Sequence, residues 1–458
     1  MSQLTRALDF RPYALSELVN TLRQSEKRIL FGFLINGAFL QTSIQQYLTA
    51  NGISAETTLA VEYVRAVTPP QYLGSFEHDD WVSSVDVLSA TSLSGQRRTD
   101  ETQILPGRER ILSGCYDGSL KVWNTSSQVI ATSFCEVYTT NKFCSKHFKG
   151  VMAAKFINPT HIASSCMHGC VTVSKYTEDA LVSSASIKPK LKLYGHKGHV
   201  SAISVHPTSN RILTASIDRS LGFFATTEGE APPEPPPQTE SYSQPKAKRP
   251  KIEPIISTPR RGPLSMMKSH EQQVSDTMFN PNDPTVAYST SWDHTLKTWD
   301  LATSACVDTR TTQESLFSLT ALPSLNLVAV GTFSDIFLID PRTTATTVSA
   351  MTLKGHRNLV ASLAPNPDSP HGLLSGSHEG CCRIWDVRGA MSDKDGRVGK
   401  CTYMIKRESL KSKPLPETGS GAQVFSVCWD KDIGILSASE DNRVQIDKVE
   451  GSIGGEGL

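Results

Sequence analysis

Two groups of cysteines lie close enough together in the sequence to suggest metal chemistry. Cys166 and Cys170 flank His168, and Cys381 adjoins Cys382. Thiolate and imidazole groups bind zinc, but a structural zinc site needs four such ligands in paired spacing, and no second pair stands at that spacing from either group. We therefore expect buried strand thiols at both places and predict no metal site formed by this chain alone.

The sequence also lacks the motifs that most often mark a catalytic centre. It contains no Gly-x-Ser-x-Gly elbow, no phosphate-binding loop and no His-Glu-x-x-His pair. These motifs would supply a nucleophile, a phosphate cradle and a zinc-bound water, respectively. We therefore predict that the protein is not an enzyme and needs no cofactor.

The overall composition excludes several other classes of protein. The 46 Lys and Arg residues nearly balance the 45 Asp and Glu residues, so a nucleic-acid-binding surface over the whole chain is not expected, although a local basic patch is possible. No stretch approaches the ~18 consecutive apolar residues of a membrane span. The first residues lack the apolar segment of a signal peptide. The ten cysteines are therefore expected to be reduced and mostly buried.

A short pattern of strands repeats along the chain. Each copy has an apolar strand, a small-residue strand that ends in a polar turn, and a strand that ends in an aromatic residue. The clearest copies run from Ile111 to Trp123, from Tyr288 to Asp300 and from Leu374 to Asp386. Seven such turns stand at positions 117, 168, 218, 293, 335, 379 and 441. Most of their spacings approach the ~40–45 residues of a four-stranded propeller blade.

The polar residues of this pattern suit a buried hydrogen-bond relay better than catalysis. A His before the first strand, a Ser or Thr on the second, an acid at the turn and a Trp on the third would satisfy one another, and each would be costly alone in the interior. Glu379 takes the turn position beside His356, and Ser289 or Thr290 takes the strand position beside His270. The predicted structural residues are Asp117, Trp123, His196, Asp218, His270, Asp293, Trp299, His356, Ser375 and Trp385.

Seven copies predict an all-β fold, a seven-bladed WD-repeat β-propeller over residues 71–448. The last copy supplies only three strands, and Gln71–Glu77 could supply the fourth, which would close the ring and remove its free edges. Residues 229–263 hold ten prolines and almost no aliphatic periodicity, so they are expected to form a disordered insert. Residues 449–458 are a C-terminal tail.

The first 68 residues follow a different pattern, that of a small α+β domain. An amphipathic helix over Tyr13–Gln24 precedes a hairpin over Phe31–Leu40, a helical turn over Thr42–Leu48 and a strand at Leu59–Tyr63. This order is the back half of a β-grasp, or ubiquitin-like, fold. The front hairpin would have to lie within Met1–Pro12, which is too short, so we expect an N-terminally truncated domain with an incomplete sheet.

A basic cluster lies within the proline-rich insert, directly after an acidic stretch. Six basic residues and one Glu lie between Gln244 and Gly262. Such a cluster indicates a nuclear localisation signal, a salt-dependent contact with RNA phosphates, or a solvated linker. The residues of this predicted signal are Lys246, Lys248, Arg249, Lys251, Arg260 and Arg261.

With both domains considered, nearly the whole chain resembles the WD-repeat ribosome-biogenesis factors of the pescadillo/block-of-proliferation complex, of the fungal type. Their paralogue Notchless has the same N-terminal domain. The most specific stretches are Tyr13–Asn20, Phe33–Gly37, Tyr47–Glu56, Val61–Ala66, Pro69–Leu73, Asp80–Ser84, Ser291–Asp300 and Cys306–Thr312.

The resemblance implies a non-enzymatic role in ribosomal RNA maturation and large-subunit assembly on pre-60S particles, in the nucleolus and nucleoplasm. The propeller would scaffold pescadillo-type and block-of-proliferation-type proteins. The ubiquitin-like domain would dock on midasin, an AAA ATPase, where Glu56 would complete the coordination of a divalent cation; hard cations prefer such oxygen ligands. Two alternatives stay open: a WD-repeat substrate adaptor of a ubiquitin ligase, and a propeller that contacts RNA directly.

Overall fold

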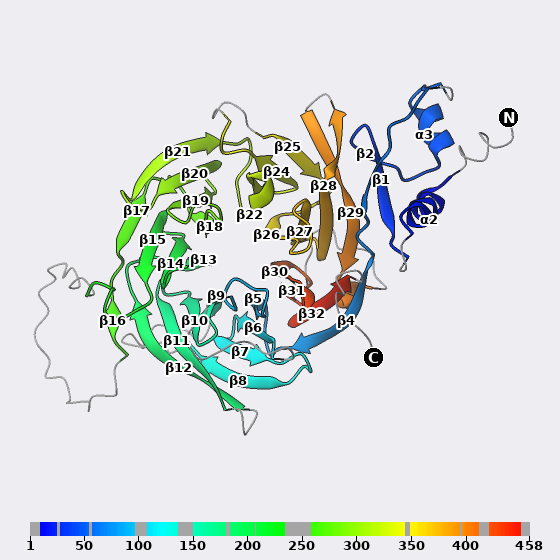
Figure 1. Ribbon diagram of the computed structural model, residues 1–458. Helices are drawn as coiled ribbons and strands as arrows, with labels where there is room; N and C mark the ends of the chain where they lie inside the picture. Colours follow the sequence, from blue (N-terminus) through cyan, green and yellow to red (C-terminus); the bar gives the residue numbers. More distant parts are fainter. Residues whose placement is uncertain are drawn as a thin grey trace, which may run out of the picture.

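A ring of seven four-stranded blades forms the body of the protein, and a small α+β domain lies beside it (Figure 1). The computed structural model describes residues 10–24, 28–54, 57–96, 108–135, 150–179, 184–206, 208–233, 258–343, 349–393, 396–411 and 421–449. Within these ranges, no helix is both long and apolar enough to cross a membrane.

In each blade the strands are antiparallel, the first lines the central channel and the fourth lies at the rim (Figure 1). Blade 1 contains β5 (Val82–Leu88), β6 (Arg110–Cys115), β7 (Ser119–Trp123) and β8 (Val129–Phe134). Blade 2 contains β9 (Val151–Asn158), β10 (His161–Cys166), β11 (Val171–Asp179) and β12 (Ser184–Leu193). Blade 3 contains β13 (Val200–Val205), β14 (Arg211–Ser216), β15 (Ser220–Ala225) and β17 (Ser265–Lys268).

The other four blades repeat this order. Blade 4 contains β18 (Val274–Phe279), β19 (Val286–Ser291), β20 (Thr295–Asp300) and β21 (Ala305–Thr311). Blade 5 contains β22 (Ser318–Leu322), β23 (Leu327–Gly331), β24 (Asp335–Ile339) and β25 (Met351–Lys354). Blade 6 contains β26 (Val360–Pro365), β27 (Gly372–Ser377), β28 (Cys381–Asp393) and β29 (Gly396–Lys406). Blade 7 contains β30 (Val424–Asp430), β31 (Gly434–Ser439), β32 (Arg443–Val449) and β4 (Pro70–Glu77).

Blade 7 is completed by β4, which comes from the start of the propeller. β4 pairs antiparallel with β32 from Glu77 opposite Arg443 to Pro70 opposite Val449. The expected ring closure is therefore confirmed, and both ends of the propeller share one sheet. Phe76 of β4 also stacks on Trp123 of blade 1, with ring centroids 5.1 Å apart, so β4 contributes to the next interface as well.

The N-terminal domain has the predicted elements: α2 (Pro12–Leu22), β1 (Phe31–Ile35), β2 (Ala38–Phe39), α3 (Ile44–Ala50) and β3 (Glu62–Arg65). β1 pairs with β2 on one side and with β3 on the other. Asn36 and Gly37 both have positive φ, as the tight β1–β2 turn requires. Residues 1–9, where the expected truncation falls, lie outside the described residues.

The insert within blade 3, between β15 and β17, differs in part from the expected disordered segment. Arg260 and Arg261 form the short strand β16 (Arg260–Arg261), which pairs in parallel with Lys192 and Leu193 of β12. Backbone hydrogen bonds to Pro259 and Arg261 hold this strand on blade 2, and Pro233 forms a bridge with Arg261. The prediction of disorder is therefore wrong for this end of the insert. Residues 234–257 lie outside the described residues.

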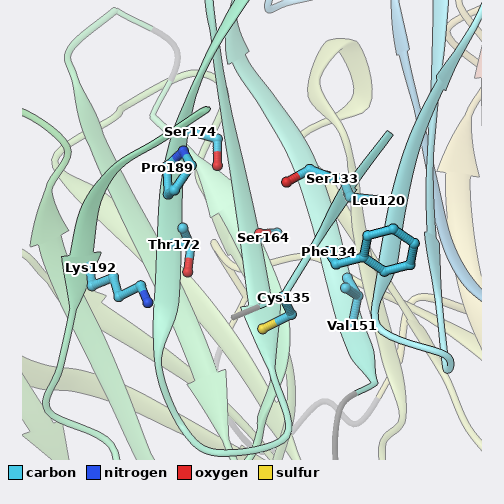
Figure 2. Close-up of a pocket in the computed structure, with 10 residues that line it drawn as sticks. All are labelled: Leu120, Ser133, Phe134, Cys135, Val151, Ser164, Thr172, Ser174, Pro189 and Lys192. Atoms are coloured by element: carbon cyan, nitrogen blue, oxygen red, sulfur yellow. The ribbon is translucent and has the colours of Figure 1, made fainter. Parts of the chain in front are cut away.

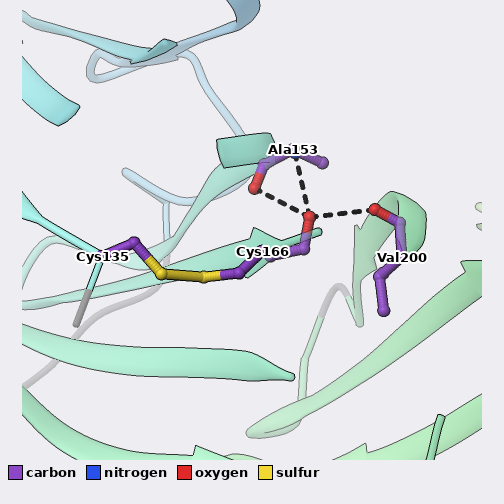
Figure 3. The surroundings of a disulfide bond; sticks show 5 residues. Cys135, Ala153, Cys166 and Val200 are labelled. Atoms are coloured by element: carbon purple, nitrogen blue, oxygen red, sulfur yellow. Dashed lines mark hydrogen bonds between the residues drawn. A yellow bond between two sulfur atoms is a disulfide. The ribbon is translucent and has the colours of Figure 1, made fainter. Parts of the chain in front are cut away.

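One cysteine pair also differs from expectation. Cys135 follows β8 of blade 1, Cys166 ends β10 of blade 2, and the packing of these blades brings the two together in a disulfide (Figure 3). The prediction of reduced thiols is therefore wrong for this pair. Beside it, the Ser165 hydroxyl bonds the Ala153 backbone and donates to the Val200 carbonyl at 3.2 Å, so that it joins β9 to the next blade.

Candidate functional site

Blade 4 contains a complete hydrogen-bond relay. The His270 ring contacts Asp293 through Nδ1 at 2.8 Å and Ser289 through Nε2 at 2.7 Å. Trp299 donates its indole N–H to the same Ser289 hydroxyl at 2.8 Å. The strand position is therefore filled by Ser289 and not by Thr290. Although burial disfavours its charge, hydrogen bonds from His270 and Thr295 hold the pKa of Asp293 well below its usual range.

Blade 6 contains the same relay with Glu379 at the turn. His356 lies 2.6 Å from Glu379 through Nδ1 and 2.6 Å from Ser375 through Nε2, and Trp385 donates to Ser375 at 2.8 Å. Burial opposes the charge of Glu379, but its hydrogen bonds lower the pKa to about 2.

This relay is also a possible cation site. His356, Glu379 and Cys381 form the one metal-compatible cluster among the described residues, with ligand atoms within 4.8 Å. Arg383 already occupies the Glu379 carboxylate at 3.1 Å, and its positive charge opposes a cation there. Burial and the Glu379 charge raise the pKa of the Cys381 thiol, which therefore stays protonated. The cluster fits a relay better than a metal centre.

Blades 1 and 3 contain variants of the relay. In blade 1, His78 and Trp123 both reach Ser113 at 2.8 Å, but Asp117 bonds the Ser119 backbone instead of His78. Burial and the Lys121 charge lower the pKa of His78 to about 4, so that its ring is neutral.

In blade 3, His196 bonds Thr214 at 2.7 Å and Asp218 at 3.1 Å. Phe224 stands opposite Ile212, the position that Trp299 holds opposite Ala287 in blade 4. This blade therefore keeps the His, the hydroxyl and the acid, and lacks only the indole donor.

Blade 7 contains a relay that the sequence analysis missed. Arg407, which is 1% exposed, donates to the Ser437 hydroxyl at 2.7 Å and to Asp441 at 2.6 and 3.1 Å. Asp447 stands opposite Ile435, the position of the tryptophan in blades 1, 4 and 6. The Ser-x-x-x-Asp spacing from 437 to 441 could have indicated a relay. Its cation could not have been identified from the sequence, because blade 7 has no His four residues before the Val that begins its first strand.

Blade 2 lacks the aromatic part of the relay. Ser174 stands opposite Ile162, where blades 1, 4 and 6 have Trp and blade 3 has Phe. Ser133 of blade 1 holds the β8 position that corresponds to Phe76 of β4. A cavity of about 50 Å³ results, bordered also by Ser164, Thr172 and the buried Lys192 (Figure 2). Within the described part of the chain, neither the Ser164 nor the Ser174 side chain forms a hydrogen bond.

The central channel is lined by the first strands of the blades and encloses about 530 Å³. Lys155 contacts Asp86 at 3.0 Å inside it. Asp276 accepts the Leu319 backbone N–H of the next blade, and burial raises the pKa of Asp276 to about 7. Asp86 makes the equivalent bond to Phe156, so these carboxylates join neighbouring blades.

An aromatic surface lies where blades 6, 7 and 1 meet, at the ends where their first strands begin. We define it by Trp81, Tyr116, His378 and Phe425. Phe425 lies 6.1 Å from Trp81, 5.9 Å from Tyr116 and 5.5 Å from His378, between ring centroids. Trp81 is 43% exposed, so its indole ring is accessible to a partner.

The candidate metal-binding loop lies in the N-terminal domain. Glu56 itself lies outside the described residues. Its neighbours Ser54 and Thr57 close a turn, because the Thr57 backbone N–H and hydroxyl both donate to the Ser54 carbonyl, at 3.2 and 2.6 Å. The domain also contacts blade 6. Tyr403 donates to the Val67 carbonyl at 3.0 Å, and the Phe39 ring packs so closely against Gly389 that a Cβ there would clash with it.

The predicted localisation residues are divided between two parts of the insert. Lys246, Lys248, Arg249 and Lys251 lie outside the described residues. Arg260 and Arg261 lie on blade 2 in β16; Arg260 lies over the Tyr194 ring at 5.0 Å, and Arg261 pairs with Glu228 at 3.0 Å. Of the predicted signal, the structure therefore describes these two arginines.

Comparisons with known proteins identify the class to which this architecture belongs. The model of the NLE (NUC135) domain matches residues 5–48, and that of the WD domain, G-beta repeat, matches residues 70–124, 187–224, 261–300 and 348–386. The chain is thus a WD-repeat propeller protein with an N-terminal NLE domain.

Curated relatives then define the family. Proteins called ribosome biogenesis protein ytm1 from Aspergillus fumigatus, Aspergillus terreus and Emericella nidulans are 52%, 53% and 52% identical over 446, 446 and 444 residues. These alignments cover 96% of this chain and 90%, 91% and 90% of the relatives. The chain belongs to the ytm1 family of ribosome biogenesis proteins, as the resemblance predicted.

Proposed function

We propose that this chain is a non-enzymatic assembly factor for the large ribosomal subunit, with separate docking surfaces on its two domains. The propeller binds pescadillo-type and block-of-proliferation-type proteins, and the N-terminal domain docks on the midasin ATPase for release from pre-60S particles. Family membership supports the ribosomal role. The two-domain construction, in which the small domain is attached to the strand that closes the ring, is the observation that supports the division of labour.

The aromatic surface supports protein binding by the propeller. Interface hot spots are enriched in Trp and Tyr because these side chains bury a large area with few rotatable bonds. Trp81, Tyr116 and Phe425 provide such a group from two blades, held together by ring contacts. This surface gives the propeller a place to bind a partner without any catalytic residue.

The N-terminal domain is suited to transmit a pull to the propeller. β3 ends at Arg65 and β4 begins at Pro70, so four residues connect the domain to blade 7. Glu56 lies in the loop closed by Ser54 and Thr57, and a loop carboxylate can complete the coordination of a divalent cation held by a partner. The Tyr403–Val67 hydrogen bond holds the connecting segment against blade 6.

Localisation follows from the same proposal. The cluster Lys246, Lys248, Arg249 and Lys251 would direct the protein to the nucleus, and assembly with precursor particles would concentrate it in the nucleolus and nucleoplasm. Replacing these four residues by Gln should leave a fluorescently tagged protein outside the nucleus. Nuclear accumulation of this variant would show that these four residues are not the localisation signal.

Tagged purification followed by mass spectrometry tests the proposal. Glu56→Ala should retain pescadillo-type and block-of-proliferation-type proteins and lose midasin, whereas Glu62→Ala, which removes an exposed carboxylate of β3, should retain both. Trp81→Ala should retain midasin and lose the pescadillo-type and block-of-proliferation-type proteins. Absence of ribosome precursors from the wild-type purification would overturn the proposal, and cullin or ligase subunits in their place would favour the ubiquitin-ligase adaptor.

A further inference from the structure

Blade 2 is much more basic than the chain as a whole. Its segment from Gly150 to Lys197 contains six lysines and two acidic residues, in a chain whose formal net charge is +1. Lys155 lies in the channel and Lys192 is buried, but other lysines of the blade are on the surface. The excess charge therefore has to be accommodated on the outside of this blade.

Three exposed lysines and a histidine lie together on one face of the sheet. Lys175 of β11 stands directly opposite His161 of β10 and directly opposite Lys188 of β12. Lys190, at the β-bulge of β12, reaches the same histidine, with 3.2 Å between its Nζ and the His161 Nε2. Like charges directly opposite each other destabilise a sheet, so Lys175 and Lys188 lower the stability of the blade. This cost suggests that the two lysines have a binding role.

Among the described side chains, no carboxylate neutralises this cluster. Glu178 of β11 is bonded to Arg110 at 2.6 Å and also accepts the Tyr176 hydroxyl. Within the described residues, Lys175, Lys188 and Lys190 form no ion pair with a carboxylate. Burial, Lys190 and Lys175 together lower the pKa of His161 to about 4, so the charge of the cluster comes from its three ammonium groups.

β16 lies beside β12 at the rim of the ring (Figure 1). Its exposed Arg260 stands opposite Lys192, and Lys192 pairs with Thr172, which lies on the other face of the sheet from Lys175 and Lys188. The lysine cluster is therefore separate from the arginine of β16.

We infer that Lys175, Lys188 and Lys190 form a surface that binds the phosphate backbone of RNA. Lysine ammonium groups recognise phosphates as point charges without reading bases, so binding should depend on salt and not on sequence. Membership of a ribosome-biogenesis family places ribosomal RNA within reach, and the surface acts in addition to the proposed protein docking.

Fluorescence anisotropy with a labelled 30-nucleotide single-stranded RNA and the full-length chain tests this inference. The variant Lys175→Gln/Lys188→Gln/Lys190→Gln should bind at least about tenfold more weakly at 100 mM KCl, and its slope of log K against log[salt] should be about 2 smaller than that of wild type. Its thermal midpoint should stay equal or rise, because the substitution removes like-charge repulsion.

A matched variant separates this surface from general charge. Lys354→Gln/Lys400→Gln/Lys406→Gln removes three exposed lysines from β25 and β29 of blades 5 and 6 and should bind RNA like wild type. Equal losses in the two variants, or no loss in the first, would overturn the inference. Tighter binding of polyglutamate than of RNA would also overturn it, in favour of an acidic protein. Because only RNA and this chain are present, the result is independent of midasin or pescadillo binding.

Discussion

In blade 4, His270 links Asp293 to Ser289, whereas in blade 7 Arg407 makes the corresponding contacts with Asp441 and Ser437. Both blades have four strands in the same order. The relay of blade 4 contains an imidazole, which can be neutral or charged, and the relay of blade 7 contains a guanidinium, which is always charged. A blade therefore requires a buried, fully hydrogen-bonded polar group at this place, and more than one side chain can provide it.

The segments that match the WD-repeat model include blade 4 and largely leave out blade 7. The four segments cover blades 1, 3, 4 and 6, in which a His before the first strand bonds a Ser or Thr of the second. Blades 2, 5 and 7 lie largely outside the matched segments. The recognisable WD pattern is thus mainly the pattern of the relay, and the blade fold is maintained where that pattern is absent.

The largest effect is expected for Arg407→Ala in blade 7. Removing one partner of a buried ion pair leaves the other unpaired, which costs about 3–5 kcal/mol. Here Asp441 and the Ser437 hydroxyl would both lose their donor. Urea unfolding should show a clearly lower midpoint, whereas Arg443→Ala, which breaks an exposed pair with Glu77, should change stability by less than about 1 kcal/mol. Equal effects of the two substitutions would contradict the central role of Arg407.

Ser289→Ala in blade 4 should have the next largest effect. It leaves the His270 Nε2 and the Trp299 indole N–H without their shared partner in the interior. Each unsatisfied buried group costs about 1–3 kcal/mol, so a total of about 2–3 kcal/mol is expected. Thr290→Ala is the matched control on the same strand and should cost less. A larger loss from Thr290→Ala would show that the relay runs through the other hydroxyl.

Two buried acids, Asp447 of blade 7 and Asp293 of blade 4, should make stability respond to pH in opposite directions. Burial raises the pKa of Asp447 in blade 7 to about 6, above its unfolded value, so the folded state binds the proton more tightly and loses stability as pH rises from 4 to 6. The pKa of Asp293 is lowered, so its contribution is lost only as pH falls below about 4. Asp447→Asn should raise stability at pH 7 by about 2 kcal/mol, an effect that should shrink at pH 4. The same urea midpoint shift at both pH values would contradict this assignment.

The smallest effect is expected for Ser164→Ala in blade 2. Ser164 stands at the position of Ser113 and Ser289, but it borders a cavity instead of bonding His and Trp. Its removal should change the free energy of unfolding by less than about 0.5 kcal/mol. Ser113→Ala in blade 1 is the matched comparison and should cost about 2 kcal/mol. A comparable cost at Ser164 would contradict this assignment.

Much of the fold could be predicted because its residues act locally. The Asn36-Gly37 turn, the helix at α2 and the closing strand β4 each follow from a short pattern. The contacts of His270 and His356 also follow, since their partners stand at repeated spacings.

The remaining features depend on contacts between distant segments. Arg407 reaches Ser437, which lies 30 residues further along the chain. Cys135 meets Cys166 only because two blades pack together, and Arg260 of β16 pairs with Lys192, which lies 68 residues earlier. The spacing of residues within a short stretch of sequence does not predict such long-range contacts. Asp117 shows the converse, since it stands at the repeated turn position and accepts the Ser119 backbone N–H, as Asp293 does from Thr295, but does not bond His78.

The most direct test of the central claim is the binding of the full-length chain to the adhesion-site domain of midasin, measured by calorimetry with and without Mg²⁺. We predict binding that requires Mg²⁺, is abolished by EDTA and by Glu56→Ala, and is unchanged by Glu62→Ala and Trp81→Ala. Binding that persists in EDTA, or that Glu56→Ala leaves intact, would contradict the proposal that a loop carboxylate of the N-terminal domain completes a partner's metal site.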